Sequence, residues 1–466
     1  MSQLNRWKAA CTVLVFCAAT ASLSPAQTFT TLDTFIPGTF SRSQSPLVQS
    51  IDGNLYGEAG SIFKVTPSGT VTLVNSKCQA LGCVGGLVQN PNLDLYGTSS
   101  TGGTFDCGTF FAITPPGTLF VKHNFACGYD GSSPQEGLAE ASSGNFYGTT
   151  LDGGGFSYGT VFEVTPSGTV TTLAEFHGPD GESPYGGVAL GVDGNLYGTT
   201  ALGGANGYGT FYKITPAGVL TVLHDFEGID GANPQAKLVQ ASNGNFYGTT
   251  TYGGVNYTCF QGCGTVFEAT TAGVVTMLHS FDGTDGSVPQ SALVQATDGN
   301  LYGTAAGNAN FECPEAPSPE ECGTIFQITT TGAFTLLHTF SGTDGGNPIG
   351  GLVQATNGTL YGTTYIGGTT TTCGNSCEGT VYSLSMGLGP FVAAVPPRDA
   401  VGHNLIILGS DLTGATSVTF NGTPATFTVV SATEIKTSVP VGATTGPLVV
   451  TTPGGTLSSN VIFRVP

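Results

Sequence analysis

Short apolar runs separated by turn residues recur through most of the chain between Gln27 and Met386. The clearest copy spans 186–226 and reads GGVALGVDGNLYGTTALGGANGYGTFYKITPAGVLTVLHDF. Four of its segments are short, rich in β-branched or aromatic residues, and bounded by Gly, Pro, Asp or Asn, which is typical of β-strands. The pattern predicts strands at Gly187–Leu190, Asn195–Thr200, Gly209–Thr215 and Val219–Phe226.

This four-strand unit is repeated along the chain. The Leu/Phe-Tyr-Gly triplet of its second strand recurs with its tyrosine at Tyr56, Tyr96, Tyr147, Tyr197, Tyr247, Tyr302 and Tyr361. The first strand recurs as often, beginning near Leu47, Leu87, Leu138, Val188, Leu238, Leu293 and Leu352. Units of this length with four strands each are typical of β-propeller blades. A β-helix or an open array is the alternative architecture.

The fourth strand indicates how the array closes. It follows the third strand in each repeat except the last, where no such strand comes after Gly379–Leu384. A matching segment, Thr28–Phe35, lies at the other end of the array. This permutation favours a closed ring, so we predict an all-β fold in which a seven-bladed propeller is closed by its N-terminal strand.

The turns divide the predicted propeller into two faces. Tight Asp-Gly, Asn-Gly or Ser-Gly hairpins join first to second strands, and Pro-x-Gly turns join third to fourth strands. The connections between second and third strands vary in length and share the opposite face with the loops between blades. Because variable loops on a rigid scaffold usually carry function, we expect any ligand on that face.

Composition supports a folded all-β chain. Of 466 residues, 72 are glycine and only 9% are charged, which fits many tight turns and argues against a helical bundle. Disorder is disfavoured because 39% of the residues are hydrophobic.

The first 26 residues resemble a secretory signal peptide. Arg6 and Lys8 precede an apolar stretch at Ala9–Ala21, and Ser24-Pro25-Ala26 supplies small residues for cleavage before Gln27. The apolar stretch is short for a membrane anchor, which is the alternative. We therefore expect a secreted, extracellular or cell-surface protein, with no membrane span after removal of the signal.

The charge of the mature chain limits its partners. Removing Arg6 and Lys8 from the 11 basic residues leaves 9 against 30 acidic ones, a formal charge of −21. Nucleic acid is excluded as a partner because its phosphates would be repelled. Cleavage also removes Trp7, the only tryptophan. We expect a monomer without a cofactor.

Ten cysteines remain after signal removal, and an even number in a secreted chain predicts disulfides. Zinc is the alternative, but the couples do not share the spacing of a zinc module. We expect five local pairs: Cys78 with Cys83, Cys107 with Cys127, Cys259 with Cys263, Cys313 with Cys322, and Cys373 with Cys377.

Two repeated patterns carry a family resemblance over roughly Gln27 to Met386. They are GLVQATNGTLYGTT at Gly351–Thr364 and GTVFEVTPSGTVTTL at Gly159–Leu173. The chain here resembles the Gloeo/Verruco (GloVer) tandem-repeat family of exported bacterial proteins, which is known by its repeat and its varied C-terminal anchors. The Asp-Gly-Asn-Leu-Tyr stretch is also similar to virginiamycin B lyase-type propellers, but only in its structural strands, so it assigns no catalytic residue.

The chain after Met386 no longer follows the repeat pattern. We expect a signal peptide at 1–26, a propeller at 27–386, a linker at 387–390 and a small β-sandwich at 391–466. The sandwich resembles an IPT/TIG domain of the immunoglobulin-like class through GSDL at Gly409–Leu412, VTFNGTPA at Val418–Ala425, Val439-Pro440 and Gly446-Pro447. The resemblance implies a spacer or adhesive unit of a surface protein.

Repeated polar residues offer little catalytic chemistry. Four histidines occupy one place near the end of the fourth strand, and five aspartates precede Gly in the loops between blades. We interpret the former as a repeat position and the latter as turn caps, with Ca²⁺ binding or glycoside hydrolysis as the alternative for the aspartates. No metal site is expected. The two sets are His123, His224, His279 and His338, and Asp130, Asp180, Asp230, Asp285 and Asp344.

Aromatic residues in the variable loops are the candidate ligand contacts, since such rings stack on sugars or grip a partner protein. Packing within the loops is the alternative role. The leading hypothesis is a non-catalytic exported protein that binds a glycan or a protein. A polysaccharide lyase or hydrolase and a purely structural matrix protein are the alternatives. The candidate residues are Phe156, Tyr158, Tyr208, Tyr252, Tyr257, Phe260, Phe311 and Tyr365.

Overall fold

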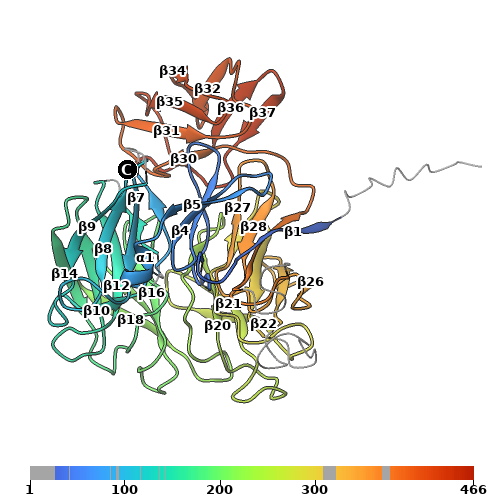
Figure 1. Cartoon of the computed structure of the whole chain (residues 1–466). Coiled ribbons are helices and arrows are strands. Elements are labelled where there is room, and N and C mark those ends of the chain that lie inside the picture. The colour runs from blue at the N-terminus through green and yellow to red at the C-terminus, as the bar shows by residue number, and fades with distance from the viewer. Residues whose placement is uncertain are drawn as a thin grey trace, which may run out of the picture.

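The protein is an all-β chain built from antiparallel sheets of four strands and one sheet of five (Figure 1). A computed structural model describes residues 27–40, 42–83, 85–90, 94–115, 117–135, 137–141, 143–307, 322–369 and 378–466. The proposed signal peptide at 1–26 lies outside these ranges.

Within the described residues, seven sheets precede residue 386, and each follows the predicted order of strands. The first three comprise β2 (Val48–Gln49), β3 (Leu55–Glu58), β4 (Ile62–Val65) and β5 (Val71–Asn75); β6 (Val88–Gln89), β7 (Leu95–Ser99), β8 (Thr109–Ile113) and β9 (Leu119–Asn124); and β10 (Ser132–Pro134), β11 (Ala139–Glu140), β12 (Phe146–Asp152), β13 (Thr160–Val164) and β14 (Val170–Glu175). The next three comprise β15 (Val188–Leu190), β16 (Leu196–Thr200), β17 (Thr210–Ile214) and β18 (Leu220–Asp225); β19 (Val239–Gln240), β20 (Phe246–Thr250), β21 (Thr265–Ala269) and β22 (Val275–Ser280); and β23 (Val294–Gln295), β24 (Leu301–Ala305), β25 (Thr324–Ile328) and β26 (Phe334–Thr339).

The last of these sheets is completed by the N-terminal strand. Its order is β1 (Thr28–Thr34), β29 (Thr380–Ser385), β28 (Leu360–Thr363) and β27 (Leu352–Gln354), with Thr28 opposite Ser385 and Thr34 opposite Thr380. The predicted pairing of the N-terminal strand with the last set is confirmed.

Apolar packing also joins the last sheet to the first. Phe35, Leu55 and Phe63 lie in one buried cluster with Tyr361 and Val381. The glycine of each Leu/Phe-Tyr-Gly triplet makes room for such clusters. A Cβ on Gly57 would come within 2.7 Å of the Phe63 ring, so the ring packs directly on the backbone of the second strand.

First-strand glutamines fasten neighbouring sheets together. Gln89 Oε1 accepts from the Ile51 N–H of the preceding turn at 2.9 Å, and Gln240 does the same for Val192 at 3.0 Å. The Thr356 N–H of the last sheet donates to Gln49 Oε1 of the first at 2.8 Å. The repeat therefore uses the same bond to link its two ends.

The structure adds elements that the pattern did not predict. A short helix, α1 (Cys78–Leu81), lies between β5 and β6, and β10 pairs with an extended β12. The first strands are only two or three residues long.

The C-terminal residues form a sandwich of two sheets around one apolar core. One sheet contains β30 (Ala393–Val395), β31 (Asn404–Leu408), β35 (Glu434–Ser438) and β34 (Phe427–Val429). The other contains β33 (Thr423–Pro424), β32 (Ser417–Phe420), β36 (Leu448–Thr452) and β37 (Gly455–Ser458). The apolar segments of this region predict five strands, and β31, β32, β34, β35 and β36 agree with them within one residue at each end. The predicted ranges are Leu405–Gly409, Ser417–Phe420, Thr426–Val430, Glu434–Val439 and Pro447–Thr451. The short strands β30, β33 and β37 were not predicted.

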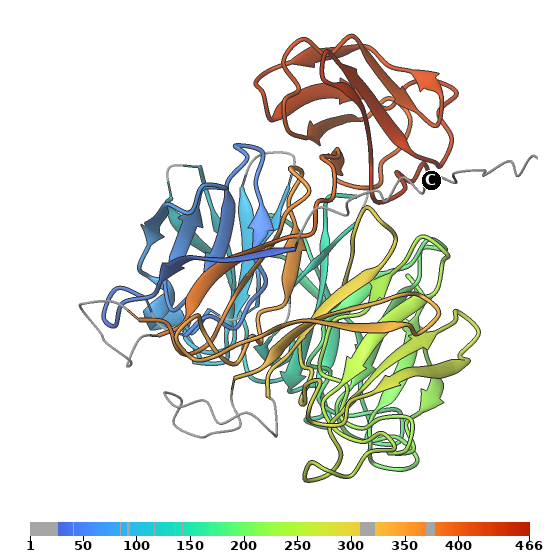
Figure 2. The ribbon, with the colours of Figure 1, turned by 90° about the vertical axis from the view of Figure 1, so that its right-hand side faces the viewer.

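The sandwich rests on the hairpin face of the propeller, as Figures 1 and 2 both show. Ile51, in the turn between β2 and β3, packs with Ile406 and Leu408 of β31. The sandwich also contacts other propeller sheets. Its Arg464 donates to Gln240 Oε1 at 3.1 Å, and its Ser410 hydroxyl lies 3.0 Å from the Thr356 hydroxyl. The hairpin face is therefore partly covered, whereas the variable loops lie at the opposite ends of the strands.

Candidate ligand-binding site

The loop face carries a pocket of about 550 Å³ between the sheets of β15–β18 and β19–β22. It is built from the β16–β17 loop, the β18–β19 loop and the β20–β21 loop. We call it the tyrosine pocket, because three of the predicted aromatic residues line it. Its lining includes Leu202, Tyr208, Glu227, Ile229, Asn233, Tyr252, Tyr257 and Gln261.

The three tyrosines are held to different degrees. Tyr208 packs over Gly228, where a side chain would come within 3.3 Å of the ring, and its other surface is exposed. Tyr252 exchanges two backbone hydrogen bonds with Ala232, so its position is set by the neighbouring loop. Tyr257 is 76% exposed at the rim. The pocket thus combines two tyrosines held by neighbouring loops with one that is largely exposed at its rim.

The β20–β21 loop that carries Tyr257 is fixed by several bonds. The predicted disulfide between Cys259 and Cys263 is present. The Asn256 Nδ2 amide donates to the Ser280 and Phe281 carbonyls at 2.9 and 3.2 Å. Ordering this loop before binding reduces the entropy lost when a ligand is held.

The other candidate aromatics do not line this pocket. Phe156 packs against His177 with the ring centres 4.3 Å apart, and Tyr158 packs over Gly178. Tyr365 lies under the Arg42 guanidinium at 5.0 Å. Phe260 is 87% exposed on the same loop as Tyr257, and Phe311 lies outside the described residues. Packing within the loops, the alternative role, therefore applies to Phe156, Tyr158 and Tyr365.

The repeated histidines and aspartates form pairs that the sequence analysis treated separately. His224 Nε2 lies 2.7 Å from Asp230 Oδ2, and the Glu227 N–H donates to Oδ1 of the same carboxylate. Each aspartate of the set accepts a backbone N–H of its own loop, which confirms its role as a turn cap. The same histidine–aspartate contact recurs at His123–Asp130, His279–Asp285 and His338–Asp344. Because the contact recurs in several repeats, we interpret it as structural: it joins the end of the fourth strand to the loop that follows.

Two carboxyl groups break the repeat, and the sequence analysis missed both. Glu58 stands where the other repeats have the first threonine after Leu/Phe-Tyr-Gly, and Glu140 stands where most repeats have the first-strand glutamine. Burial raises the pKa of Glu58 to about 8. Burial, followed by repulsion from Asp399, raises the pKa of Glu140 to about 8. An acid at a position that is threonine in all the other repeats, or glutamine in most of them, was the available sequence signal.

Three of the five predicted disulfides are described, namely Cys78–Cys83, Cys107–Cys127 and Cys259–Cys263. Cys313, Cys373 and Cys377 lie outside the described residues, so the other two pairs stay predictions. Among the described residues, a single set of potential metal-binding side chains lies within 4.8 Å of one another, and it consists of Glu58, Cys78 and Cys83.

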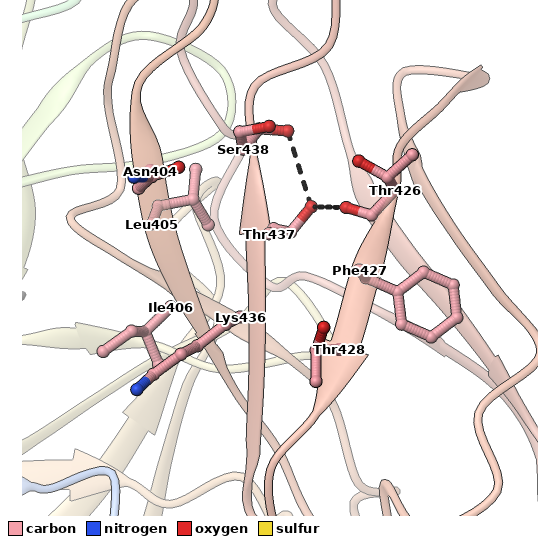
Figure 3. Close-up of a pocket in the computed structure, with 9 residues that line it drawn as sticks. All are labelled: Asn404, Leu405, Ile406, Thr426, Phe427, Thr428, Lys436, Thr437 and Ser438. Atoms are coloured by element: carbon pink, nitrogen blue, oxygen red, sulfur yellow. Dashed lines mark hydrogen bonds between the residues drawn. The ribbon is translucent and has the colours of Figure 1, made fainter.

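The sandwich has a groove of its own, of about 470 Å³, across β31, β35 and β34 (Figure 3). Its floor is tied by Thr437 Oγ1, which donates to the Thr426 carbonyl at 2.8 Å. Lys436 is the charged group in it, and its Nζ lies 3.6 Å from Glu434. Aromatic rings do not converge here as they do in the tyrosine pocket.

In the part of the chain that the structure describes, no helix is long and apolar enough to cross a membrane. No curated protein matches the chain. Among solved structures, a streptogramin B lyase is similar to it at 14% identity with a TM-score of 0.52, covering 77% of this chain and 97% of the lyase. A gluconolactonase from Xanthomonas campestris is similar at 12% identity with a TM-score of 0.41, covering 69% and 93%. The lyase supports the propeller fold and, at this identity, the fold alone.

The two parts of the chain also match known families. Residues 84–314 match the Gloeobacter/Verrucomicrobia repeat, and residues 391–465 match the IPT/TIG domain. Both matches agree with the resemblances drawn from the repeated patterns and from the C-terminal motifs. Residues 84–314 are therefore Gloeobacter/Verrucomicrobia repeats, and the chain carries a C-terminal IPT/TIG domain of the immunoglobulin-like class.

Proposed function

We propose that this protein is an exported, non-catalytic binding protein of the cell surface or extracellular space, and that it binds a glycan in the tyrosine pocket. The observation that carries the proposal is the convergence of Tyr208, Tyr252 and Tyr257 from separate loops on one pocket. Its volume lies in the range of small-ligand sites, so it holds a short stretch of sugar units.

The chemistry of the pocket suits a neutral sugar. Tyrosine rings offer flat apolar surfaces against which the C–H faces of a sugar ring pack, while their hydroxyls remain available for hydrogen bonds. Glu227, Asn233 and Gln261 supply acceptors and donors for sugar hydroxyls at the edge. With a formal net charge of −19, the protein disfavours polyanionic glycans.

Export rests on the proposed signal peptide and on the local disulfides, which persist in oxidising compartments. The sandwich is compatible with a place at the surface, since it leaves the loop face uncovered. Glu58 and Glu140, the carboxyl groups that break the repeat, are not among the residues that line the pocket.

The test compares glycan-array binding of the full chain with that of a Tyr208→Ala, Tyr252→Ala, Tyr257→Ala variant. We expect binding to neutral glycans that falls more than tenfold in the variant, because truncating buried aromatic anchors costs about 2 kcal/mol or more each. Tyr129→Ala is the matched control, since Tyr129 is an exposed loop tyrosine outside the pocket.

Tyr257→Ala alone guards against misfolding of the triple variant, because this side chain is largely exposed. A glycan that binds all variants equally would contradict the assignment of the pocket. Binding of a protein instead of a glycan through the same tyrosines would retain the site and overturn the ligand class. Turnover of a polysaccharide would overturn the non-catalytic reading.

A further inference from the structure

Glu58 carries a buried carboxyl group at a position where the other repeats have the hydroxyl group of a threonine. Six other repeats place threonine there, namely Thr98, Thr149, Thr199, Thr249, Thr304 and Thr363. Glu58 is 1% exposed, and it lies opposite Ile62 of β4. Burying a carboxyl group in place of a small hydroxyl is unfavourable unless its oxygens find partners.

Only one of the two carboxyl oxygens has a hydrogen-bond partner. The Ser45 hydroxyl donates to Oε2 at 3.3 Å, whereas Oε1 is buried and accepts no hydrogen bond within the described part of the chain. A buried polar atom of this kind points to a missing ion, water or redox partner.

The nearest chemistry is the disulfide at the start of α1. Cys78 is fully buried and Cys83 is 6% exposed. An oxygen of Glu58 and the two sulfur atoms all lie within 4.8 Å of one another. In the disulfide the sulfurs are weak acceptors and cannot satisfy the carboxylate oxygen. Reduction would convert them into two thiols beside Glu58, which become thiolate ligands when they lose their protons.

We propose that the reduced chain binds one borderline-soft divalent ion, of the Zn²⁺ type, through the thiolates of Cys78 and Cys83 and the carboxylate of Glu58. Two sulfur ligands and one oxygen suit such an ion, and three protein ligands leave a fourth position for water. The disulfide is then the closed, metal-free state of the same site, and oxidation releases the ion.

The chemistry balances with an external dithiol as the reductant. The dithiol gives two electrons and two protons to the Cys78–Cys83 bond and closes into its own cyclic disulfide. The incoming ion displaces both thiol protons, which pass to the buffer. Where Glu58 carries a proton, that proton leaves as well.

The test uses the full chain, reduced with dithiothreitol, desalted without oxygen and titrated with Co²⁺ as a spectroscopic substitute for Zn²⁺. We expect a thiolate-to-cobalt charge-transfer band that saturates at one ion per chain and disappears in C78S/C83S. Zn²⁺ should displace the cobalt. The C259S/C263S variant is the matched control, because that short disulfide has no carboxyl group within reach among the described residues.

Glu58→Thr restores the residue of the other repeats and should weaken Co²⁺ binding more than tenfold. Glu58→Gln, which keeps the volume, should do the same, and near-ultraviolet circular dichroism confirms that both variants fold. Cobalt binding that is independent of Cys78 and Cys83, or within twofold of the parent chain in both Glu58 variants, would overturn the proposal. A Cys78–Cys83 bond that resists dithiothreitol in the folded protein would overturn it too.

Discussion

The Thr433 hydroxyl donates a hydrogen bond to the Ile51 carbonyl at 2.9 Å, joining the sandwich to the first hairpin of the propeller. The same hairpin supplies Ile51, which packs against Ile406 and Leu408. Arg464 reaches a different sheet through Gln240. The contacts between the sandwich and the propeller therefore span several sheets and combine apolar with polar groups.

Ile51→Asp should release the sandwich from the propeller. The new carboxylate would lose its hydration against Ile406 and Leu408, a cost of about 2 kcal/mol or more. Small-angle scattering should show a larger maximum dimension, and proteolysis should cut within 387–390. Val441→Asp, at an 89% exposed position of the sandwich, is the control. An unchanged scattering profile for Ile51→Asp would mean that the polar contacts hold the sandwich without this cluster.

Deleting residues 27–35 should destabilise the propeller. The deletion exposes the edge of β29 and removes Phe35 from the cluster that joins the last sheet to the first. Loss of one large buried aromatic side chain alone costs about 3–5 kcal/mol. We expect a melting temperature lower by several degrees and a new tendency to aggregate. Phe35→Ala tests the cluster while leaving β1 in place, and an unaltered melting temperature for both variants would argue against closure through β1.

The seven sheets of the propeller were predictable because the same pattern of strands and turn residues recurs in every repeat. Turn residues and the enrichment of β-branched and aromatic residues located the strands, and the missing fourth strand after Leu384 located the pairing of β1. The sequence did not reveal α1, which occurs in one repeat. It did not reveal β10 either, because the equivalent pairing in other repeats is a single bridge, such as Glu182 with Leu202 and Ala232 with Tyr252. The short sandwich strands β30, β33 and β37 were not predicted because no repeated pattern marks them.

The site was only partly predictable. The loop face and the aromatic candidates followed from length variation. Pattern could not separate Tyr208 from Tyr158, because each packs over the equivalent glycine of its loop and only Tyr208 also lines the pocket. The distinction depends on which neighbouring loops approach, and that is a tertiary property. The pairing of His224 with Asp230 was hidden in the same way, because the two residues were considered on separate elements.

Glu140 offers a prediction that depends on pH. In other repeats the glutamine at this position both accepts and donates, as Gln295 does with the Ser242 N–H and the Gly299 carbonyl. A carboxylate cannot donate to the turn carbonyl. Burial first, and then the nearby Asp399, raise the pKa of Glu140 to about 8, whereas an unfolded chain has a glutamate pKa of about 4.3.

The sign of the effect follows from this rise. The folded chain holds the Glu140 proton more tightly than the unfolded chain, so the associated stability is present below about pH 4 and is lost as the pH rises towards 8. Glu140→Gln removes the titration and restores the donor. We expect the variant to be more stable than the parent by about 2 kcal/mol at pH 8.5, after discounting for partial exposure, and by much less at pH 4.

Urea denaturation at pH 4, 6 and 8.5 measures the difference in the free energy of unfolding between the variant and the parent. Gln295→Glu is the reverse control, because it introduces a carboxylate at an equivalent position and should lose stability as the pH rises. If the Glu140→Gln variant and the parent keep a constant difference across this range, then Glu140 is ionised in the folded protein at neutral pH, and water or a cation reaches it between the propeller and the sandwich.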